Sequence, residues 1–261
     1  MSFVEVEAGR LYYETVGAGA PLVCLHGFAL DSRMWADQAA ALAGRFQVIG
    51  YDLRGFGRSS LPAGPFAHVD DLSVLLDRLG LPRAHVMGLS LGGGVAIDFA
   101  LAYPERVASL IAVDSTLGGF PWTKDWSPPG RAARSQGLAA ARSVWLEDEL
   151  FAPAMTQPAV AARLRQMAAD YSGWHWLNRS PERPLAGGPA YDRLGAIRAP
   201  ALVVVGELDL PDFHRLAGHL AAHLPDVRRV VLPGVGHMSN MEAPAAFNAA
   251  LLEFLETAPT P

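Results

Sequence analysis

A serine between glycines is the residue of this chain best suited to covalent chemistry. Ser90 is the central residue of 88–92, Gly-Leu-Ser-Leu-Gly, which matches the pattern G-x-S-x-G. The pattern follows the apolar run His85 to Met87 and precedes the helical run Val95 to Ala102. Between a strand and a helix the turn must be sharp, and glycines lack the Cβ atoms that would keep the two elements apart. Neither G-x-G-x-x-G nor a Walker lysine is present, so a phosphate-binding turn is disfavoured and we expect Ser90 to project as a nucleophile.

His237 is the predicted general base for this serine, because a serine hydroxyl is a weak nucleophile near neutral pH. It ends the segment 233–237, Pro-Gly-Val-Gly-His, which directly follows the apolar run Arg229 to Leu232. A loop at the carboxyl end of a strand is where a parallel sheet presents its active site. His219 and His223 share a helix face but lack the glutamate of H-E-x-x-H, so the sequence predicts no metal site and no cofactor.

The base in turn needs a carboxylate that fixes its tautomer and stabilises the imidazolium ion. Asp209 directly follows the apolar run Ala201 to Val205 and is the predicted partner, so the triad has the chain order nucleophile, acid, base. Asp114 also ends an apolar run, and Glu207 lies two residues before Asp209. Both stay open as alternative acids.

Two backbone N–H groups are predicted to hold the oxyanion that forms when a serine attacks a carbonyl group. One is the N–H of Leu91, the residue after the nucleophile. The other is the N–H of Phe28 in the segment 25–28, Leu-His-Gly-Phe, where a strand gives way to a loop and Gly27 permits the turn. His26 is then expected to have a structural role.

Short apolar runs that alternate with helical patterns predict the elements that position these residues. Residues 3–7 and 10–15 are expected to form an antiparallel hairpin. The later runs are expected to be parallel strands that are covered on both faces and joined by helical crossovers. These runs are Leu22–Leu25, Val48–Tyr51, His85–Met87, Ser109–Val113, Ala201–Val205 and Arg229–Leu232. The alternation predicts an α/β fold.

Two amphipathic stripes predict helices that pack on the sheet. The first consists of Val69, Leu72, Leu75, Leu76 and Leu79, with Asp70, Asp71, Asp77 and Arg78 expected on the opposite, polar face. The second consists of Phe247, Leu251, Phe254 and Leu255, behind a proline at 244 that suits a first helical turn.

Residues 116–190 interrupt the alternation, because they separate two strand-like runs by far more than one crossover helix needs. They include five of the six tryptophans, Trp122, Trp126, Trp145, Trp174 and Trp176, and many prolines. We expect 1–115 and 191–261 to form the core and 116–190 a mobile helical cap, whose aromatic rings pack together or border an apolar pocket over the nucleophile. The cap has 8 basic and 6 acidic side chains, which permits a substrate with a carboxylate but fits solvated arginines equally well.

The composition excludes several classes of protein. The 261 residues are 51% apolar and 18% charged, as in globular proteins. The 26 acidic residues outnumber the 21 basic ones and no basic cluster is present, so the expected partner is a small-molecule substrate and not nucleic acid. With a single cysteine, Cys24, no signal-peptide pattern and no apolar stretch long enough for a membrane span, the chain is expected to be cytoplasmic.

Taken together and in chain order, five segments resemble the α/β-hydrolase superfamily. They are His-Gly-Phe at 26–28, Asp-Leu-Arg-Gly-Phe-Gly-Arg-Ser at 52–59, Gly-Leu-Ser-Leu-Gly-Gly at 88–93, Gly-Glu-Leu-Asp at 206–209 and Gly-His at 236–237. The resemblance implies an eight-stranded, mostly parallel sheet with helices on both faces and a helical cap after the sixth strand. It also implies the triad Ser90, Asp209 and His237, and a structural role for the segment 52–59.

Within that superfamily, the segment 26–94 is most similar to small bacterial carboxylesterases, non-haem perhydrolases and 3-oxoadipate enol-lactonases. Ser90 argues against haloalkane dehalogenases and epoxide hydrolases, which have aspartate at this position. The resemblance implies a serine hydrolase that cleaves esters or lactones of small, largely apolar acids through an acyl-enzyme. A meta-cleavage C–C hydrolase and a ligand receptor with only slow hydrolysis are the alternatives.

Overall fold

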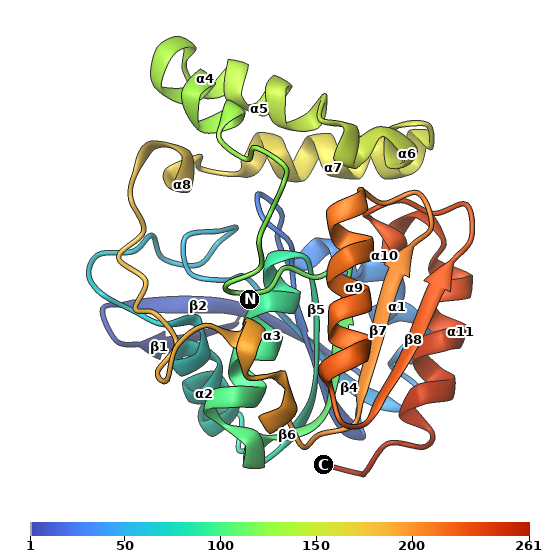
Figure 1. The fold of residues 1–261 in the computed structure, drawn as a ribbon. Helices are drawn as coiled ribbons and strands as arrows, with labels where there is room; N and C mark the ends of the chain where they lie inside the picture. The colour runs from blue at the N-terminus through green and yellow to red at the C-terminus, as the bar shows by residue number, and fades with distance from the viewer. Residues whose placement is uncertain (1) are drawn as a thin grey trace.

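An eight-stranded sheet forms the centre of this computed structural model, which describes residues 2–261 (Figure 1). The strands are β1 (Ser2–Val6), β2 (Gly9–Val16), β3 (Ala20–Leu25), β4 (Phe46–Tyr51), β5 (Ala84–Leu89), β6 (Val107–Val113), β7 (Ala201–Gly206) and β8 (Val227–Leu232). Their order in the sheet is β1-β2-β4-β3-β5-β6-β7-β8. The pairs β1–β2 and β2–β4 are antiparallel, and all the others are parallel. The predicted α/β fold with a mostly parallel sheet is confirmed.

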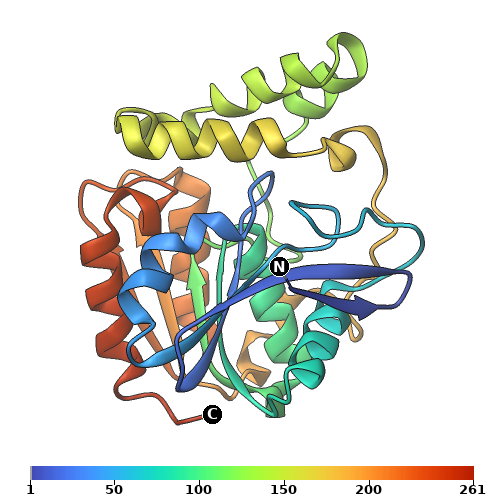
Figure 2. The same ribbon diagram turned by 180° about the vertical axis from the view of Figure 1, so that it is seen from behind.

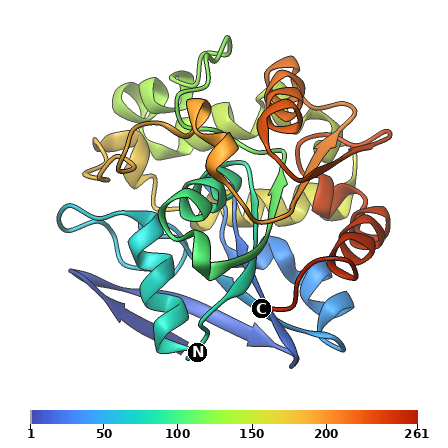
Figure 3. The same cartoon turned by 60° about the horizontal axis from the view of Figure 1, so that its bottom comes forward.

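Helices cover both faces of the sheet, which explains why its central strands are continuous apolar runs. On one face lie α2 (His68–Arg78), α3 (Leu91–Ala102) and α9 (Pro211–His223). On the other, which Figure 2 shows in front, lie α1 (Ala36–Leu42) and α11 (Pro244–Leu255). β5, β6 and β7 are consequently buried at every residue. Seen from below in Figure 3, the blue β1–β2 hairpin and the red α11 lie at opposite sides of the molecule.

The strand β8 differs from the prediction. It was expected to be covered on both faces, but most of its residues are exposed or half-buried. β8 is an edge strand, so it has only one neighbouring strand, and its arginines reach solvent. Arg228 forms an ion pair with Glu253 of α11 at 2.8 Å.

The helix α2 forms where its apolar stripe predicts, but one of its acidic residues lies on the other face. Leu72, Leu75 and Leu76 are buried as expected. Asp71, predicted on the polar face, is also buried and accepts two hydrogen bonds from Arg54, at 2.9 and 2.6 Å. The expectation for Asp71 is therefore wrong, because its partner belongs to the loop 52–59 and not to the helix itself.

Between β6 and β7 the chain forms a separate layer of helices above the carboxyl ends of the strands (Figures 1 and 2). This upper helical layer contains α4 (Pro128–Gln136), α5 (Leu138–Leu146), α6 (Ala152–Met155), α7 (Pro158–Asp170) and α8 (Trp174–Leu177). Prolines stand in the first turns of α4, α6 and α7, where the missing N–H is not needed. None of the helices in residues 2–261 has the length and apolar character that a membrane span requires.

Candidate active site

Ser90 lies in the turn between β5 and α3, in a backbone conformation that residues with a Cβ atom rarely adopt. Its φ is 53° and its ψ is −116°, and such strain persists only where the surrounding structure holds it. The N–H of Ser90 donates to the carbonyl of Val113 at 2.9 Å, and its own carbonyl accepts the N–H groups of Gly94 and Thr116, each at 3.0 Å. Bonds to β6, to α3 and to the loop after β6 thus hold the serine at the predicted strand-to-helix turn.

Glycines on either side of Ser90 allow backbones to approach each other. A Cβ atom at Gly88 would lie 2.1 Å from the carbonyl oxygen of Gly92, and one at Gly92 would lie 2.3 Å from that of Leu25. Real Cβ atoms do not come so close to backbone, so substitution would push α3 away from β5 and β3. The glycines bring the start of α3 directly against the loop that follows β3.

His237 and Asp209 come from the loops after β8 and β7, and their side chains meet. Nδ1 of His237 lies 2.9 Å from a carboxylate oxygen of Asp209, and both residues are buried. The second carboxylate oxygen of Asp209 accepts the N–H of Leu210 at 2.7 Å. When Nδ1–H donates to Asp209, the lone pair is on Nε2, where a general base needs it.

A small cavity lies between Ser90 and His237. Both residues line it together with Gly27 and Phe28, and its volume of about 10 Å³ is roughly that of one water probe. The serine and the imidazole form no hydrogen bond with each other in this conformation. Catalytic hydrogen bonds are often long before a substrate binds. The structure therefore gathers the hydroxyl, the imidazole and the loop after β3 around one point.

The two other carboxylates considered from the sequence have different surroundings. Glu207 is exposed and accepts a backbone N–H of the loop after β8. Asp114 is buried beside Asp209 and accepts hydrogen bonds from the N–H of Gly206 at 2.8 Å and the hydroxyl of Ser239 at 2.5 Å. Burial, and after it the charge of Asp209, raise the pKa of Asp114 well above its usual range. Neither alternative carboxylate is hydrogen-bonded to the imidazole, whose partner is Asp209.

Asp114, Asp209 and His237 are also the one group of residues in 2–261 whose possible metal-ligand atoms lie within 4.8 Å of one another. Hydrogen bonds account for this clustering. Asp209 is hydrogen-bonded to the imidazole, and Asp114 accepts hydrogen bonds from a backbone N–H and a hydroxyl. The arrangement is suited to holding one negative charge behind an imidazole.

Glu242 is a residue of this site that the sequence analysis missed. It ends the short helix α10 (Ser239–Glu242), and its two carboxylate oxygens accept the N–H of Gly236 at 2.8 Å and that of Met238 at 2.9 Å. These N–H groups stand on either side of His237. The buried carboxylate therefore fixes the loop that carries the imidazole. In the sequence, the one signal is a glutamate five residues after the histidine.

The two N–H groups predicted to hold an oxyanion belong to the surroundings of Ser90. Phe28 and Leu91 both line the larger cavity above the serine. Leu91 begins α3, so its N–H has no acceptor within the helix. In the loop after β3, a Cβ atom at Gly27 would lie only 3.6 Å from the Cβ atom of Ser90.

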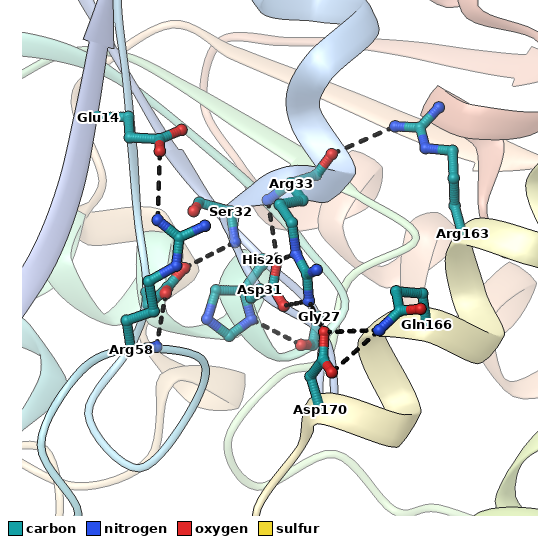
Figure 4. Close-up of polar contacts among 11 residues, drawn as sticks. Glu14, His26, Gly27, Asp31, Ser32, Arg33, Arg58, Arg163, Gln166 and Asp170 are labelled. Atoms are coloured by element: carbon teal, nitrogen blue, oxygen red, sulfur yellow. Dashed lines mark hydrogen bonds and ion pairs between the residues drawn. The ribbon is translucent and has the colours of Figure 1, made fainter. Parts of the chain in front are cut away.

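His26 orients the second of these N–H groups. The Gly27 carbonyl accepts the Nδ1–H of His26 at 2.8 Å (Figure 4). It also accepts the N–H of Leu30 at 3.2 Å, while Nε2 of His26 accepts the N–H of Leu53 at 2.9 Å. Burial lowers the pKa of His26, so the neutral ring keeps one donor and one acceptor. Because the peptide bond between Gly27 and Phe28 is trans and planar, the N–H of Phe28 points opposite to the anchored carbonyl.

This geometry predicts different effects for two substitutions of His26. A glutamine can replace the Nε2 acceptor but not the Nδ1 donor, whereas an asparagine can replace the donor but not the acceptor. We expect His26→Gln to lower kcat about tenfold at nearly unchanged KM, because the Phe28 N–H is no longer aimed. His26→Asn should lower kcat much less. Steady-state kinetics on a neutral ester checks this, with thermal unfolding of both variants as the control, and a larger loss of kcat in His26→Asn would contradict it.

A cavity of about 440 Å³ lies above Ser90, between the sheet and the upper helical layer. Its lining residues are Phe28, Ser90, Leu91, Thr116, Trp122, Trp126, Ser127, Gly130, Arg134, Trp145, Leu150, His175, Trp176 and Phe213. Four of the five tryptophans predicted in the cap therefore border it, and Trp174 does not. His175 stacks on Phe56 with ring centroids 4.4 Å apart, and burial lowers its pKa to about 4, so it is neutral at pH 7.

Ion pairs connect the upper helical layer with the loop after β3. Arg33, in the short helix η1 (Ser32–Trp35), contacts Asp31 at 2.6 Å and Asp170 of α7 at 2.7 Å. Arg163 of α7 contacts Asp37 of α1 at 2.5 Å. Figure 4 shows the contacts of Arg33 with Asp31 and Asp170 beside His26 and Gly27. Most of these side chains are partly exposed, so each pair contributes about 1 kcal/mol or less.

Comparisons with known proteins agree with this fold. The family model described as the alpha/beta hydrolase fold matches residues 20–244. A protein of Azorhizobium caulinodans named as the carbamate hydrolase RutD is 32% identical over 257 residues, with 94% of each chain covered. The 3-oxoadipate enol-lactonase 2 of Acinetobacter baylyi is 30% identical over 253 residues, covering 92% of this chain and 91% of its own. The structure of Est816, described as an N-acyl homoserine lactone degrading enzyme, has a TM-score of 0.81 at 30% identity and covers 97% and 100% of the two chains.

The family model matches most of the chain, and the relatives align over nearly their full length. The chain belongs to the alpha/beta hydrolase superfamily, as the five segments of the sequence predict. It is thus a hydrolase by fold and by relationship.

Proposed function

We propose that this protein is a serine hydrolase that cleaves carboxylic esters or lactones of small, largely apolar acids. The observation that carries the proposal is the hydrogen bond of 2.9 Å between His237 and Asp209, beside a cavity shared with Ser90 and Phe28. In the proposal Ser90 is the nucleophile, His237 the general base, Asp209 the acid, and the N–H groups of Phe28 and Leu91 form the oxyanion hole.

The reaction proceeds in two halves that use the same groups. Nε2 of His237 takes the hydroxyl proton of Ser90 while Oγ forms a bond to the carbonyl carbon and the π electron pair moves to the carbonyl oxygen. The N–H groups of Phe28 and Leu91 hold this oxyanion. His237 then gives its proton to the leaving oxygen as the C–O bond breaks. Water repeats these steps on the acyl-serine and releases the acid.

In the same proposal residues 116–190 form a cap over a core made of 1–115 and 191–261, of which residue 1 lies outside the described part. The aromatic rings of the cap supply an apolar surface for the acyl or alcohol group of the substrate. Two polar contacts join the cap to the core, Asp170 of the cap with Arg33 and Arg163 of the cap with Asp37, and they support a cap that can move. Printed names of relatives, an enol-lactonase and a lactone-degrading enzyme among them, support ester or lactone chemistry.

The test is covalent labelling of the native protein with a fluorophosphonate, followed by peptide mass spectrometry and by turnover of 4-nitrophenyl acetate. We expect one label per chain, located on Ser90, and loss of both label and turnover in Ser90→Ala. Labelling without turnover would favour a receptor with slow hydrolysis. Turnover of a dienoate C–C substrate in place of esters would favour the meta-cleavage alternative, since a C–C hydrolase relative is 32% identical over 265 residues.

A further inference from the structure

The cavity above Ser90 has one formally charged side chain among its lining residues, and it is a cation. Arg134 of α4 is that residue, and no carboxylate of residues 2–261 lines the cavity. The lining imidazole, His175, is neutral at pH 7 because burial lowers its pKa to about 4. The other lining groups are aromatic, aliphatic or hydroxyl-bearing. A guanidinium beside so many aromatic rings gives the cavity a positive end.

Most of the hydrogen-bonding capacity of Arg134 is unused. Its Nη1 donates to the carbonyl oxygen of Trp176 at 3.0 Å, and within residues 2–261 it has no ion-pair partner. A guanidinium offers five N–H donors, so most of them stay available. Other arginines of the upper helical layer are neutralised, Arg131 by Asp125 at 3.2 Å and Arg163 by Asp37 at 2.5 Å. Arg142 of α5 and Arg165 of α7 also have no ion-pair partner within residues 2–261, but neither lines this cavity, so Arg134 is the unpaired cation that borders it.

Arg134 is an exposed residue, and a glycine stands one turn before it in α4. Gly130, one turn earlier in α4, also lines the cavity, and a Cβ atom there would lie 3.3 Å from Nη1 of Arg134. The same Cβ atom would lie 3.6 Å from the carbonyl oxygen of Trp176, so the glycine leaves room for the contact between Arg134 and Trp176. α4 and α8 lie side by side at one end of the upper helical layer (Figure 1), and the guanidinium lies between them.

We propose that Arg134 determines specificity by binding a carboxylate at the end of the acyl chain. The inference rests on the proposed function and narrows its substrate class to half-esters of dicarboxylic acids and lactones that bear a carboxylate. The scissile carbonyl lies at Ser90, the methylene chain lies among the tryptophan rings, and the distal carboxylate accepts two N–H groups of Arg134. Two parallel N–H···O bonds to a carboxylate are the geometry for which guanidinium is suited.

The test compares monomethyl adipate with methyl hexanoate, which has the same chain length and no charge. In Arg134→Met we expect kcat/KM for monomethyl adipate to fall about tenfold, mainly through KM, because a charged hydrogen bond is lost. Methyl hexanoate should change less than about twofold. The matched control is Arg179→Met, which removes an exposed cation after α8 that does not line the cavity. It should leave both substrates unaffected.

Four results would overturn the inference. Equal losses for both esters would make Arg134 a structural tie between α4 and α8. No loss for either ester would remove it from recognition. A loss in Arg179→Met as large as in Arg134→Met would mean that only the overall charge of the layer matters, as would selectivity abolished by moderate salt alone.

A binding measurement separates this inference from the proposed reaction. In Ser90→Ala, quenching of tryptophan fluorescence reports ligand in the cavity without any turnover. We expect monomethyl adipate to bind more tightly than methyl hexanoate, and about tenfold less tightly once Arg134 is also replaced by methionine. If the native protein hydrolyses no ester but this difference is found, the proposed reaction fails and the anion site stands. If esters are hydrolysed and the difference is absent, the anion site fails alone.

Discussion

Replacing Asp209 by asparagine is expected to lower kcat for a neutral ester about ten-thousandfold while KM stays within a few-fold. In the native protein the Nδ1–H of His237 donates to Asp209 at 2.9 Å, which leaves the lone pair on Nε2. An asparagine amide offers an N–H in place of one carboxylate oxygen and favours the opposite tautomer. It also removes the negative charge that stabilises the imidazolium ion in the transition state.

The control for this prediction is Asp114→Asn, a substitution with the same change of atoms in the adjacent carboxyl group. Burial and the charge of Asp209 raise the pKa of Asp114 well above its usual range, which favours its uncharged form. An asparagine can keep both of its contacts, since its oxygen accepts the N–H of Gly206 and its amide donates to the hydroxyl of Ser239. We expect kcat to fall less than about tenfold.

Both variants are measured by steady-state kinetics across pH 6 to pH 9, with circular dichroism to confirm that each variant is folded. The variant with the larger loss of kcat identifies the carboxylate that acts as the acid of the triad. If Asp114→Asn loses several thousandfold and Asp209→Asn little, the acid of the triad is Asp114, and the loop after β7 only supports it. Equal losses would mean that the two carboxyl groups act as one buried unit with a single shared charge.

The candidate site could be predicted from the sequence because each of its three proposed catalytic residues follows an apolar run. In a parallel sheet the carboxyl ends of neighbouring strands meet at one edge, so residues far apart in the chain converge there. Ser90, Asp209 and His237 each follow such a run, and in the structure they lie in the turn or loops directly after β5, β7 and β8. The role of the glycines around Ser90 could also be predicted, because a residue without a Cβ atom lets two backbone segments approach closely.

What the sequence did not reveal depends on contacts between loops. Glu242 supports the imidazole only because the loop after β8 curves over its carboxylate. Asp71 is buried because Arg54 enters from a loop that no helical periodicity describes. The edge position of β8 follows from the order of strands in the sheet, and apolar runs carry no information on which strand comes last. Long-range pairing, not local preference, decides all three.

Ser90 and His237 come from distant parts of the chain, and a double substitution tests whether they act together. We expect Ser90→Ala and His237→Ala each to lower kcat about 10⁵- to 10⁶-fold, and the double variant to be no slower than either single one. The imidazole accepts the proton of the serine hydroxyl, so once one of the two groups is removed, the other no longer contributes to the reaction. Residual hydrolysis above the rate in water would come from the N–H groups of Phe28 and Leu91.

Single-turnover hydrolysis of 4-nitrophenyl acetate by highly purified variants is the measurement, and circular dichroism confirms that each variant is folded. Losses that multiply in the double variant would show that the two residues contribute independently, as two binding residues would. A His237→Ala protein with nearly native kcat would contradict the role of His237 as the general base, because Ser90 would then need another base. His175 is the other imidazole at the cavity, and its pKa of about 4 makes it a weak base at pH 7. His237, held by Asp209 and by the loop that Glu242 anchors, is the imidazole whose loss the reaction should not survive.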